Sequence, residues 1–331
     1  MRTIAAFATP FAALATALAA ALAAGSASAQ GYPTRPVTII VGFAPGGGTD
    51  TVARAMQRKL SELLGQPVVI DNRAGAGGTI AADIVAKAQP DGYTILLATI
   101  AALAVAPHLN SKLPYDPLKA FAPVSMATES GNVLVVNPSV LPAKTLAEYV
   151  KLANSRPGGI AYGTSGVGSA GHLAGELFRL TAHATLVHVP YKGGGPAMSD
   201  LLGGQIPSVF ASAATATPQV QTGKLVALGS TGARRSAALP NVPTIAEQGY
   251  PGYQATNWYA YVAPARTPKN IVDRLNHDIV ATLKDPATNA NILKQGEEPT
   301  PSTPEELAKH MKSEYDTWGK VIRDAGIPKE Q

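Results

Sequence analysis

The sequence predicts an α/β protein made of two doubly wound domains. Short apolar runs of strand type alternate with amphipathic runs of helix type, and this alternation starts a second time near residue 133. Strands that are joined by helices pair in parallel and need cover on both faces, so each repeat indicates one helix-covered parallel sheet.

The first repeat begins with a continuous apolar strand over residues 37–41. Apolar residues at helical spacing then predict a helix over 51–64, which ends at Gly65. The rest of this repeat is a strand at 68–70, a helix at 79–88 and a strand at 94–98.

The second repeat has the same design and is followed by a C-terminal region with one strand and two helices. Its expected elements are strands at 133–136, 160–162, 186–189, 207–211 and 225–229, with helices at 145–155 and 169–181. The C-terminal region is predicted as a strand at 259–263, a helix at 268–283 and a last helix whose capping box is Thr303-Pro304-Glu305-Glu306.

The two repeats predict two domains with a cleft between them. We expect the chain to cross between the domains near residues 129–133 and 240–251, with the last 80 or so residues returning to the first domain. Domain 1 is then 30–131 plus 251–331, and domain 2 is 132–250.

The first 29 residues have the pattern of a cleaved secretory signal. Arg2 precedes an apolar stretch over 4–24, and Ala27-Ser28-Ala29 provides an A-x-A cleavage site after Ala29. A membrane anchor is the alternative, but the stretch is mostly alanine and is interrupted by Pro10. We therefore expect an exported protein that does not insert into the membrane.

Composition excludes several functional classes. The chain has no cysteine, so disulfides, thiolate catalysis and iron–sulfur clusters are excluded. The formal net charge is +5, but the basic residues are scattered, which argues against nucleic-acid binding. The six histidines form no metal-binding motif, so we expect no metal.

The stretch Gly166-Val167-Gly168-Ser169-Ala170-Gly171 fits the dinucleotide pattern G-x-G-x-x-G between a predicted strand and a predicted helix. No acidic residue follows about 20 positions later to hold a ribose, so we expect no cofactor. What remains is a glycine-rich helix start that binds anions, with hydroxyl donors at Thr164, Ser165 and Ser169. A helix-capping role for Ser169 alone is the alternative.

A second glycine-rich loop, FAPGGGTD at 43–50, also joins a strand to a helix. It offers consecutive N–H groups and a hydroxyl but lacks the lysine of a nucleotide-triphosphate loop. We expect Asp50 to order this loop rather than to act as a catalytic acid. Ligands of parallel α/β sheets bind at the carboxyl ends of strands, so one such loop in each domain predicts a clamp around a single anion.

The chain resembles the substrate-binding proteins of tripartite tricarboxylate transporters, the Bug family, over essentially its whole length after the signal. The motifs that carry the resemblance, in order, are FAPGGGTD at 43–50, DNRAGAGG at 71–78, HLAGE at 172–176, HVPYKG at 188–193 and LPNVPT at 239–244. The resemblance implies a periplasmic binding protein-like (Venus flytrap) architecture, with two domains on a hinge, that delivers a captured solute to membrane partners.

The resemblance also implies that the two glycine-rich loops hold a ligand carboxylate, partly through water. Relatives that bind amino acids often have an aspartate after the strand at 207–211, where this chain has Ser212, so we expect an uncharged or carboxylate far end on the ligand. The loop at 98–103 favours an apolar middle. The candidate ligand-binding residues are Phe43, Ala44, Gly47, Gly48, Thr49, Thr99, Thr164, Ser165, Gly168, Ser169, His172 and Ser212.

The predicted function is that of a periplasmic receptor for a small carboxylate, either a di- or tricarboxylate or an aromatic acid, acting as a monomer with permease subunits as partners. A ligand sensor for a two-component system is one alternative, and a nicotinamide-dependent oxidoreductase is another of a different class. A hydrolase is excluded, because neither Ser165 nor Ser169 has the flanking glycines of G-x-S-x-G.

Overall fold

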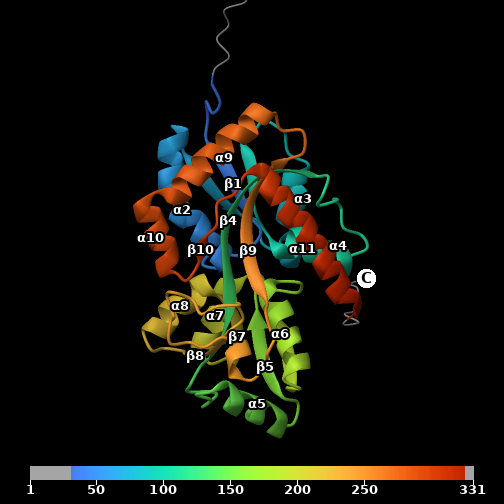
Figure 1. Ribbon diagram of the computed structural model, residues 1–331, viewed down its shortest axis with the longest axis vertical. Coiled ribbons are helices and arrows are strands. Elements are labelled where there is room, and N and C mark those ends of the chain that lie inside the picture. Colours follow the sequence, from blue (N-terminus) through green and yellow to red (C-terminus); the bar gives the residue numbers. More distant parts are fainter. Residues whose placement is uncertain (1–30, 325–331) are drawn as a thin grey trace, which may run out of the picture. The chain divides into compact units, whose positions relative to one another are not determined.

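The computed structural model describes residues 31–324 (Figure 1). The predicted signal segment and its cleavage site therefore lie outside the described residues. Residues 31–34 belong to a separate small unit with a cis peptide bond between Tyr32 and Pro33. Residues 35–324 lie in one compact unit, which is described below.

The first repeat folds as predicted. Strand β1 pairs in parallel with β2 on one side and with β3 on the other. Helices α2 and α3 connect these strands, and α2 begins three residues earlier than the apolar spacing indicates. The elements are β1 (Val37–Val41), α2 (Gly48–Leu64), β2 (Val68–Asn72), α3 (Thr79–Ala86) and β3 (Thr94–Thr99).

Two long strands connect this part of the sheet to the rest. The sheet order is β2-β1-β3-β9-β4-β7-β5-β6, and β4 (Phe121–Val136) and β9 (Thr256–Pro264) run antiparallel at its centre (Figure 1). Strand β4 pairs with β9 from Phe121 to Gly131 and with β7 from Asn132 to Val136. We call the strands on the β9 side of this change the first half of the sheet, and those on the β7 side the second half.

The second half contains the second predicted repeat. Strand β5 is parallel to β6 and β7, while β4 is antiparallel to β7 and β8. Its strands are β5 (Ile160–Thr164), β6 (Leu186–Pro190), β7 (Ser208–Ser212) and β8 (Val226–Ser230). Its helices are α5 (Leu146–Ser155), α6 (Ala170–Thr181), α7 (Gly194–Leu202) and α8 (Ala213–Gln221), of which α7 and α8 are not evident in the sequence.

The C-terminal region packs on the first half. Helix α9 (Lys269–Lys284) lies against α2, and α11 (Pro304–Asp324) against β4. Between them are α10 (Pro286–Lys294) and the short β10 (Glu298–Pro299), which pairs with β4. The capping box is confirmed, because the Glu306 N–H donates to Thr303 Oγ1 (3.1 Å) and the Thr303 N–H donates to Glu306 Oε2 (2.8 Å).

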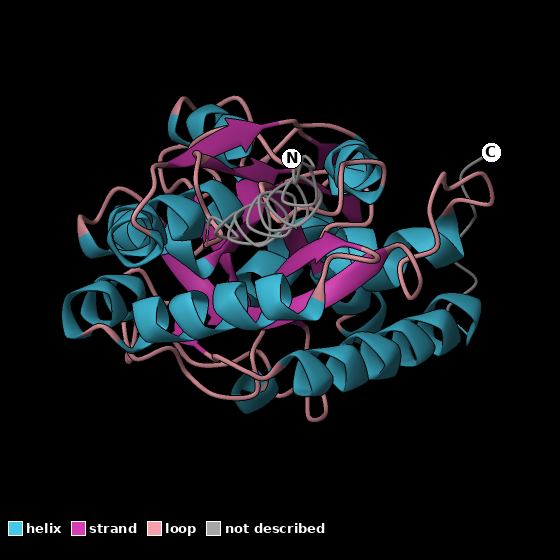
Figure 2. Cartoon of the chain, turned by 90° about the horizontal axis from the view of Figure 1, so that it is seen from above, coloured by secondary structure: helices cyan, strands magenta, loops and turns pink. Residues whose placement is uncertain are grey.

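Separate hydrophobic clusters support the two halves. One joins residues of β1, β3 and β9 to α3 and α11 and extends to the start of α6, and two others lie on opposite faces of β4 and β7 in the second half. Helices flank the strands on both sides when the sheet is viewed from above (Figure 2). The predicted α/β class is confirmed. Within residues 31–324, no helix combines the length and apolarity that a membrane span requires.

Candidate functional site

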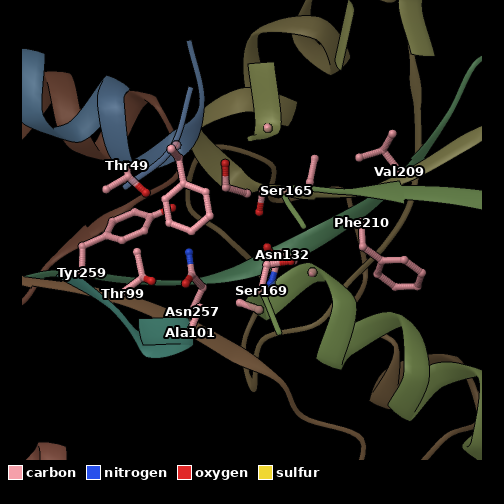
Figure 3. A pocket seen from close by; sticks show the side chains of 17 residues that line it. Thr49, Thr99, Ala101, Asn132, Ser165, Ser169, Val209, Phe210, Asn257 and Tyr259 are labelled. Atoms are coloured by element: carbon pink, nitrogen blue, oxygen red, sulfur yellow. The ribbon is translucent and has the colours of Figure 1, made fainter. Parts of the chain in front are cut away.

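A small pocket lies where strands of both halves end. From the first half it is lined by Phe43 after β1, by Thr99 at the end of β3, and by Asn257 and Tyr259 of β9. The second half contributes the start of its part of β4, the loop after β5 and the end of β7 (Figure 3). Its volume is about 30 Å3, and a buried water needs roughly 10–15 Å3. The space therefore fits a group of the size of a carboxylate.

The starts of four helices meet at this pocket. Its lining includes Gly48 at the start of α2, Ala170 at the start of α6, Gly194 at the start of α7, and Ser212, the N-cap of α8. First-turn N–H groups have no partner within their own helix, and each helix start carries a partial positive charge. None of the residues that line the pocket is charged. The arrangement therefore favours an anion.

Asp50 explains the shape of the loop at 43–50. Its carboxylate accepts hydrogen bonds from the Gly46 N–H (2.9 Å), from Arg54 Nε (2.9 Å) and from Asn72 Nδ2 (3.0 Å). Burial raises the pKa of Asp50, but the bonds from Arg54, Gly46 and Asn72 outweigh it and hold the pKa below its usual value. Asp50 thus orders the loop, as expected.

Backbone hydrogen bonds explain why other parts of this loop do not line the pocket. The Ala44 N–H donates to Lys192 O (3.2 Å), and the Gly47 N–H lies 3.4 Å from Ala44 O. These two donors are engaged by backbone carbonyls. At the end of this loop, Gly48 and Thr49 lie in the first turn of α2 and line the pocket.

Two neutral histidines brace the loop after β5. His172 and His188 stack with ring centroids 4.1 Å apart. His172 Nδ1 accepts the Gly168 N–H (3.1 Å), and His188 Nε2 lies 2.7 Å from the Thr164 hydroxyl. Burial lowers the pKa of His172, and burial together with His172 lowers the pKa of His188 to about 4. Because the Gly168 N–H and the Thr164 hydroxyl are used within the protein, they support the loop rather than the pocket.

Ser169 has two roles in the structure. Its hydroxyl caps α6 by accepting the His172 N–H at 3.3 Å, and its side chain also lines the pocket. The next two residues, Ala170 and Gly171 in the first turn of α6, also line the pocket.

The structure brings together seven of the predicted site residues and leaves five aside. Those that line the pocket are Phe43, Gly48, Thr49, Thr99, Ser165, Ser169 and Ser212. Gly168 lines a neighbouring cavity instead. Neither cavity is lined by Ala44, Gly47, Thr164 or His172, so a ligand contact by these residues stays a prediction.

Sequence reasoning missed three polar residues of the pocket: Asn132, Asn257 and Tyr259. Each lies in a strand whose sequence is mostly apolar. The indication in the sequence is that Asn132 directly precedes the apolar run 133–136, Asn257 directly precedes the run 258–263, and Tyr259 lies within that run. Among the described residues, Asn132 Nδ2 and Thr99 Oγ1 are buried polar atoms without a hydrogen-bond partner. Buried polar atoms rarely stay unpaired, so these two donors indicate a place for a ligand atom or water.

A larger cavity of about 390 Å3 adjoins the pocket. The two spaces share Phe43, Ala101 and Ser165, and the larger one has the size of a ligand site. Glycine-rich backbone and Asn110 line it from the first half, and the loop at 165–168 with Pro190, Tyr191 and Lys192 lines it from the second half. Lys192 is the one charged side chain in this lining.

Comparison with known proteins gives a consistent result. Residues 52–327 match the model of the tripartite tricarboxylate transporter family receptor. The chain is 41% identical over 300 residues to protein BugT of Bordetella pertussis, covering 90% of this chain and 92% of BugT.

Two solved structures have the same fold. The periplasmic binding protein BugD is 34% identical, with a TM-score of 0.87 and coverage of 90% of this chain and 100% of BugD. Rpa4515 of R. palustris, solved with adipate, is 37% identical, with a TM-score of 0.87 and the same coverage of both chains. The periplasmic binding protein-like fold expected from the sequence is confirmed.

Proposed function

The chain belongs to the tripartite tricarboxylate transporter receptor family, whose members are periplasmic solute-binding proteins, and from this premise we propose that it captures a small carboxylate at the meeting point of α2, α6, α7 and α8. The observation that carries the proposal is the convergence of four helix starts on an uncharged pocket of carboxylate size. The related structure with adipate supports the same class of ligand.

Capture requires donors from both halves of the sheet. Gly48, Thr49 and Thr99 belong to the first half, and Asn132 and Ser169 to the second. Closing the halves over the anion removes water, which strengthens each hydrogen bond to the charge. The proposed hinge lies where β4 changes its pairing partner, between residues 131 and 132, which coincides with the predicted domain boundary. Closure then reports occupancy to the transporter.

A panel of carboxylates tests the proposal. Adipate, malate, citrate and benzoate are each mixed with the purified protein, and melting temperature and small-angle scattering are recorded. We expect at least one acid to raise the melting temperature and to reduce the radius of gyration. If no acid changes either quantity, the proposed function fails.

Ser169→Ala separates capping from binding. Loss of the cap should lower the free energy of unfolding by about 1 kcal/mol. Loss of a hydroxyl that pairs with a buried carboxylate should weaken binding by about 1–3 kcal/mol in addition. Calorimetry with adipate and urea unfolding measure the two effects separately. Unchanged affinity with reduced stability would assign Ser169 to capping alone.

The larger cavity beside the pocket is the proposed location of the far end of the ligand. Phe43 and Ala101, which border both spaces, suit an apolar middle. Lys192 then faces the distal group, and its ammonium favours a second carboxylate over a neutral or cationic end. We infer that an elongated dicarboxylate fits the two spaces together better than a short monocarboxylate does.

Lys192→Met tests this placement. Lys192 is exposed, so the expected loss is modest, up to about fivefold in adipate affinity. Hexanoate, which has the same chain length and only one carboxylate, should lose nothing. Lys224→Met, at another exposed lysine, serves as the charge control. An equal loss for adipate and hexanoate would place the distal group elsewhere.

Export with cleavage after Ala29, a monomeric state and delivery to permease subunits belong to the same proposal. The sensor alternative shares the binding step and differs only in the docking partner. An oxidoreductase is not favoured. In the GVGSAG loop the Gly166 N–H donates to Thr164 Oγ1 and the Gly168 N–H to His172, so neither is available to a pyrophosphate.

A further inference from the structure

A buried carboxyl group, that of Glu297, lies between the two halves of the sheet. The side chain follows α10, is 1% exposed and accepts one direct hydrogen bond, from Thr128 Oγ1 of β4 to Oε2 (3.0 Å). The Ser130 hydroxyl and the Ala214 backbone N–H lie near the carboxyl, but within residues 31–324 neither Oε1 nor the Ser130 hydroxyl has a partner of direct hydrogen-bond geometry. The carboxyl is thus deeply buried and has few direct hydrogen bonds.

Glu297 shares its surroundings with the anion pocket. Ala214 is in the first turn of α8, two residues after Ser212, which lines the pocket. Tyr259 interacts with Glu297 and also with Thr49 and Ser212 on the pocket side. A carboxylate in the pocket and an ionised Glu297 would therefore both draw on the positive end of α8.

We propose that Glu297 is a positioning residue that couples carboxylate capture to a proton: its carboxyl links the start of α8 to β4, and in its ionised form it opposes the anion in the pocket. The inference rests on the proposed carboxylate site. It assigns to this site a pH dependence that none of the lining residues supplies.

The change between neutral and ionised Glu297 falls near neutral pH. Burial raises the pKa of Glu297 to about 7, against the opposing effect of the hydrogen-bond donors at Ser130, Thr128 and Ala214. A second negative charge in the pocket raises that pKa further, so binding takes up a proton. Affinity is then highest below pH 7 and falls as the pH rises through 7.

The neighbouring charges do not reproduce this behaviour. Helix α8 carries no charged side chain, and burial raises the pKa of Tyr259 on β9 far above neutrality. Glu298 of β10 pairs with Arg234 on the exposed side, where Glu129 of β4 also lies. On the pocket side, the lowered pKa values of His172 and His188 keep both rings neutral above pH 7.

The first arm of the test needs no ligand. Because the folded-state pKa of about 7 exceeds the usual 4.5, the neutral carboxyl stabilises the fold below pH 4.5, and this stability is lost as the pH rises toward 7. Relative to Glu297→Gln, the wild-type melting temperature should therefore fall between about pH 4.5 and 7. Parallel profiles for the two proteins overturn the inference. Glu298→Gln is the matched control and should follow the wild type.

The second arm uses adipate, whose carboxyls are ionised above about pH 6. If the bound anion raises the pKa of Glu297 by one unit, wild-type affinity should fall about tenfold between pH 6 and 9. Glu297→Gln should bind with little change over that range. Thr128→Val, which removes a donor that favours the ionised form, should move the inflection to higher pH. Equal pH profiles for wild type and Glu297→Gln overturn the coupling.

The two arms separate this inference from the proposed function. Absence of adipate and other carboxylate binding at every pH would count against the carboxylate site. Binding with parallel pH profiles would leave the site in place and remove the role of Glu297.

Discussion

Gly48→Ala should abolish carboxylate binding while leaving the protein folded. A Cβ at this position would overlap the Ser212 hydroxyl and lie 2.6 Å from the Tyr259 hydroxyl, inside the space assigned to the anion. Since Ser212 belongs to the second half of the sheet, the added methyl group also holds the two halves apart. Overpacking of a closed site costs about 1–3 kcal/mol. With the loss of the anion's space added, adipate affinity should fall about 100-fold or more.

Calorimetry with adipate, together with the melting temperature of the ligand-free protein, measures the effect of Gly48→Ala. Gly203→Ala is a suitable control, since Gly203 ends α7 away from the pocket and the added Cβ would approach no closer than 3.3 Å to Ser199 O. Adipate affinity within twofold of the wild type would show that the anion lies elsewhere.

The regular parallel parts of the fold are predictable from the sequence because burial on both faces demands continuous apolar runs. The first half of β4 is not predictable in this way. Residues 121–131 contain Pro123, polar residues and Gly131, yet Ser125 and Thr128 are fully buried because their hydroxyls bond to Met126 O and Glu297. Glu297 lies 169 residues from Thr128, and the Ser302 N–H, which also donates to Ser125 Oγ, comes from 177 residues away, so no local pattern reveals these partners.

Helices α7 and α8 were missed for a related reason. Helix α7 opens with Gly194-Gly195-Pro196, and α8 contains Pro218 and two threonines, a composition typical of loops. Packing against β7 and against each other stabilises them, rather than helix propensity. As a result, the sequence predicted two of the four helix starts at the pocket.

The glycine-rich loops indicate regions that line the pocket, but the pattern does not show which of their residues line it. Gly47 and Gly48 are equivalent in the sequence pattern, yet Gly47 lies against Gly194 and only Gly48 lines the pocket. Likewise, Thr164 and His172 stand beside Ser165 and Ser169 in the chain but brace the loop from behind. Which of two neighbouring residues faces the pocket depends on hydrogen bonds formed across the fold.

Asn132→Asp should convert the pocket from one that attracts anions to one that repels them. Asn132 is 2% exposed, and its Nδ2 is a buried donor without a partner among the described residues. Aspartate has nearly the same shape but replaces this donor with a negative charge. Like charges placed together cost several kcal/mol, so adipate affinity at pH 7.5 should fall about 100-fold or more.

The acid range distinguishes this repulsion from a loss of shape. Burial raises the pKa of the introduced carboxyl, so at pH 5 a larger fraction is neutral and can donate a hydrogen bond. Adipate affinity relative to wild type at the same pH should therefore recover between pH 7.5 and pH 5. Asn291→Asp, on the exposed side of α10, carries the same charge change and should show neither effect. If the loss of affinity is equal at both pH values, Asn132 shapes the pocket without facing the anion. If the affinity is unchanged, Asn132 is not part of the site.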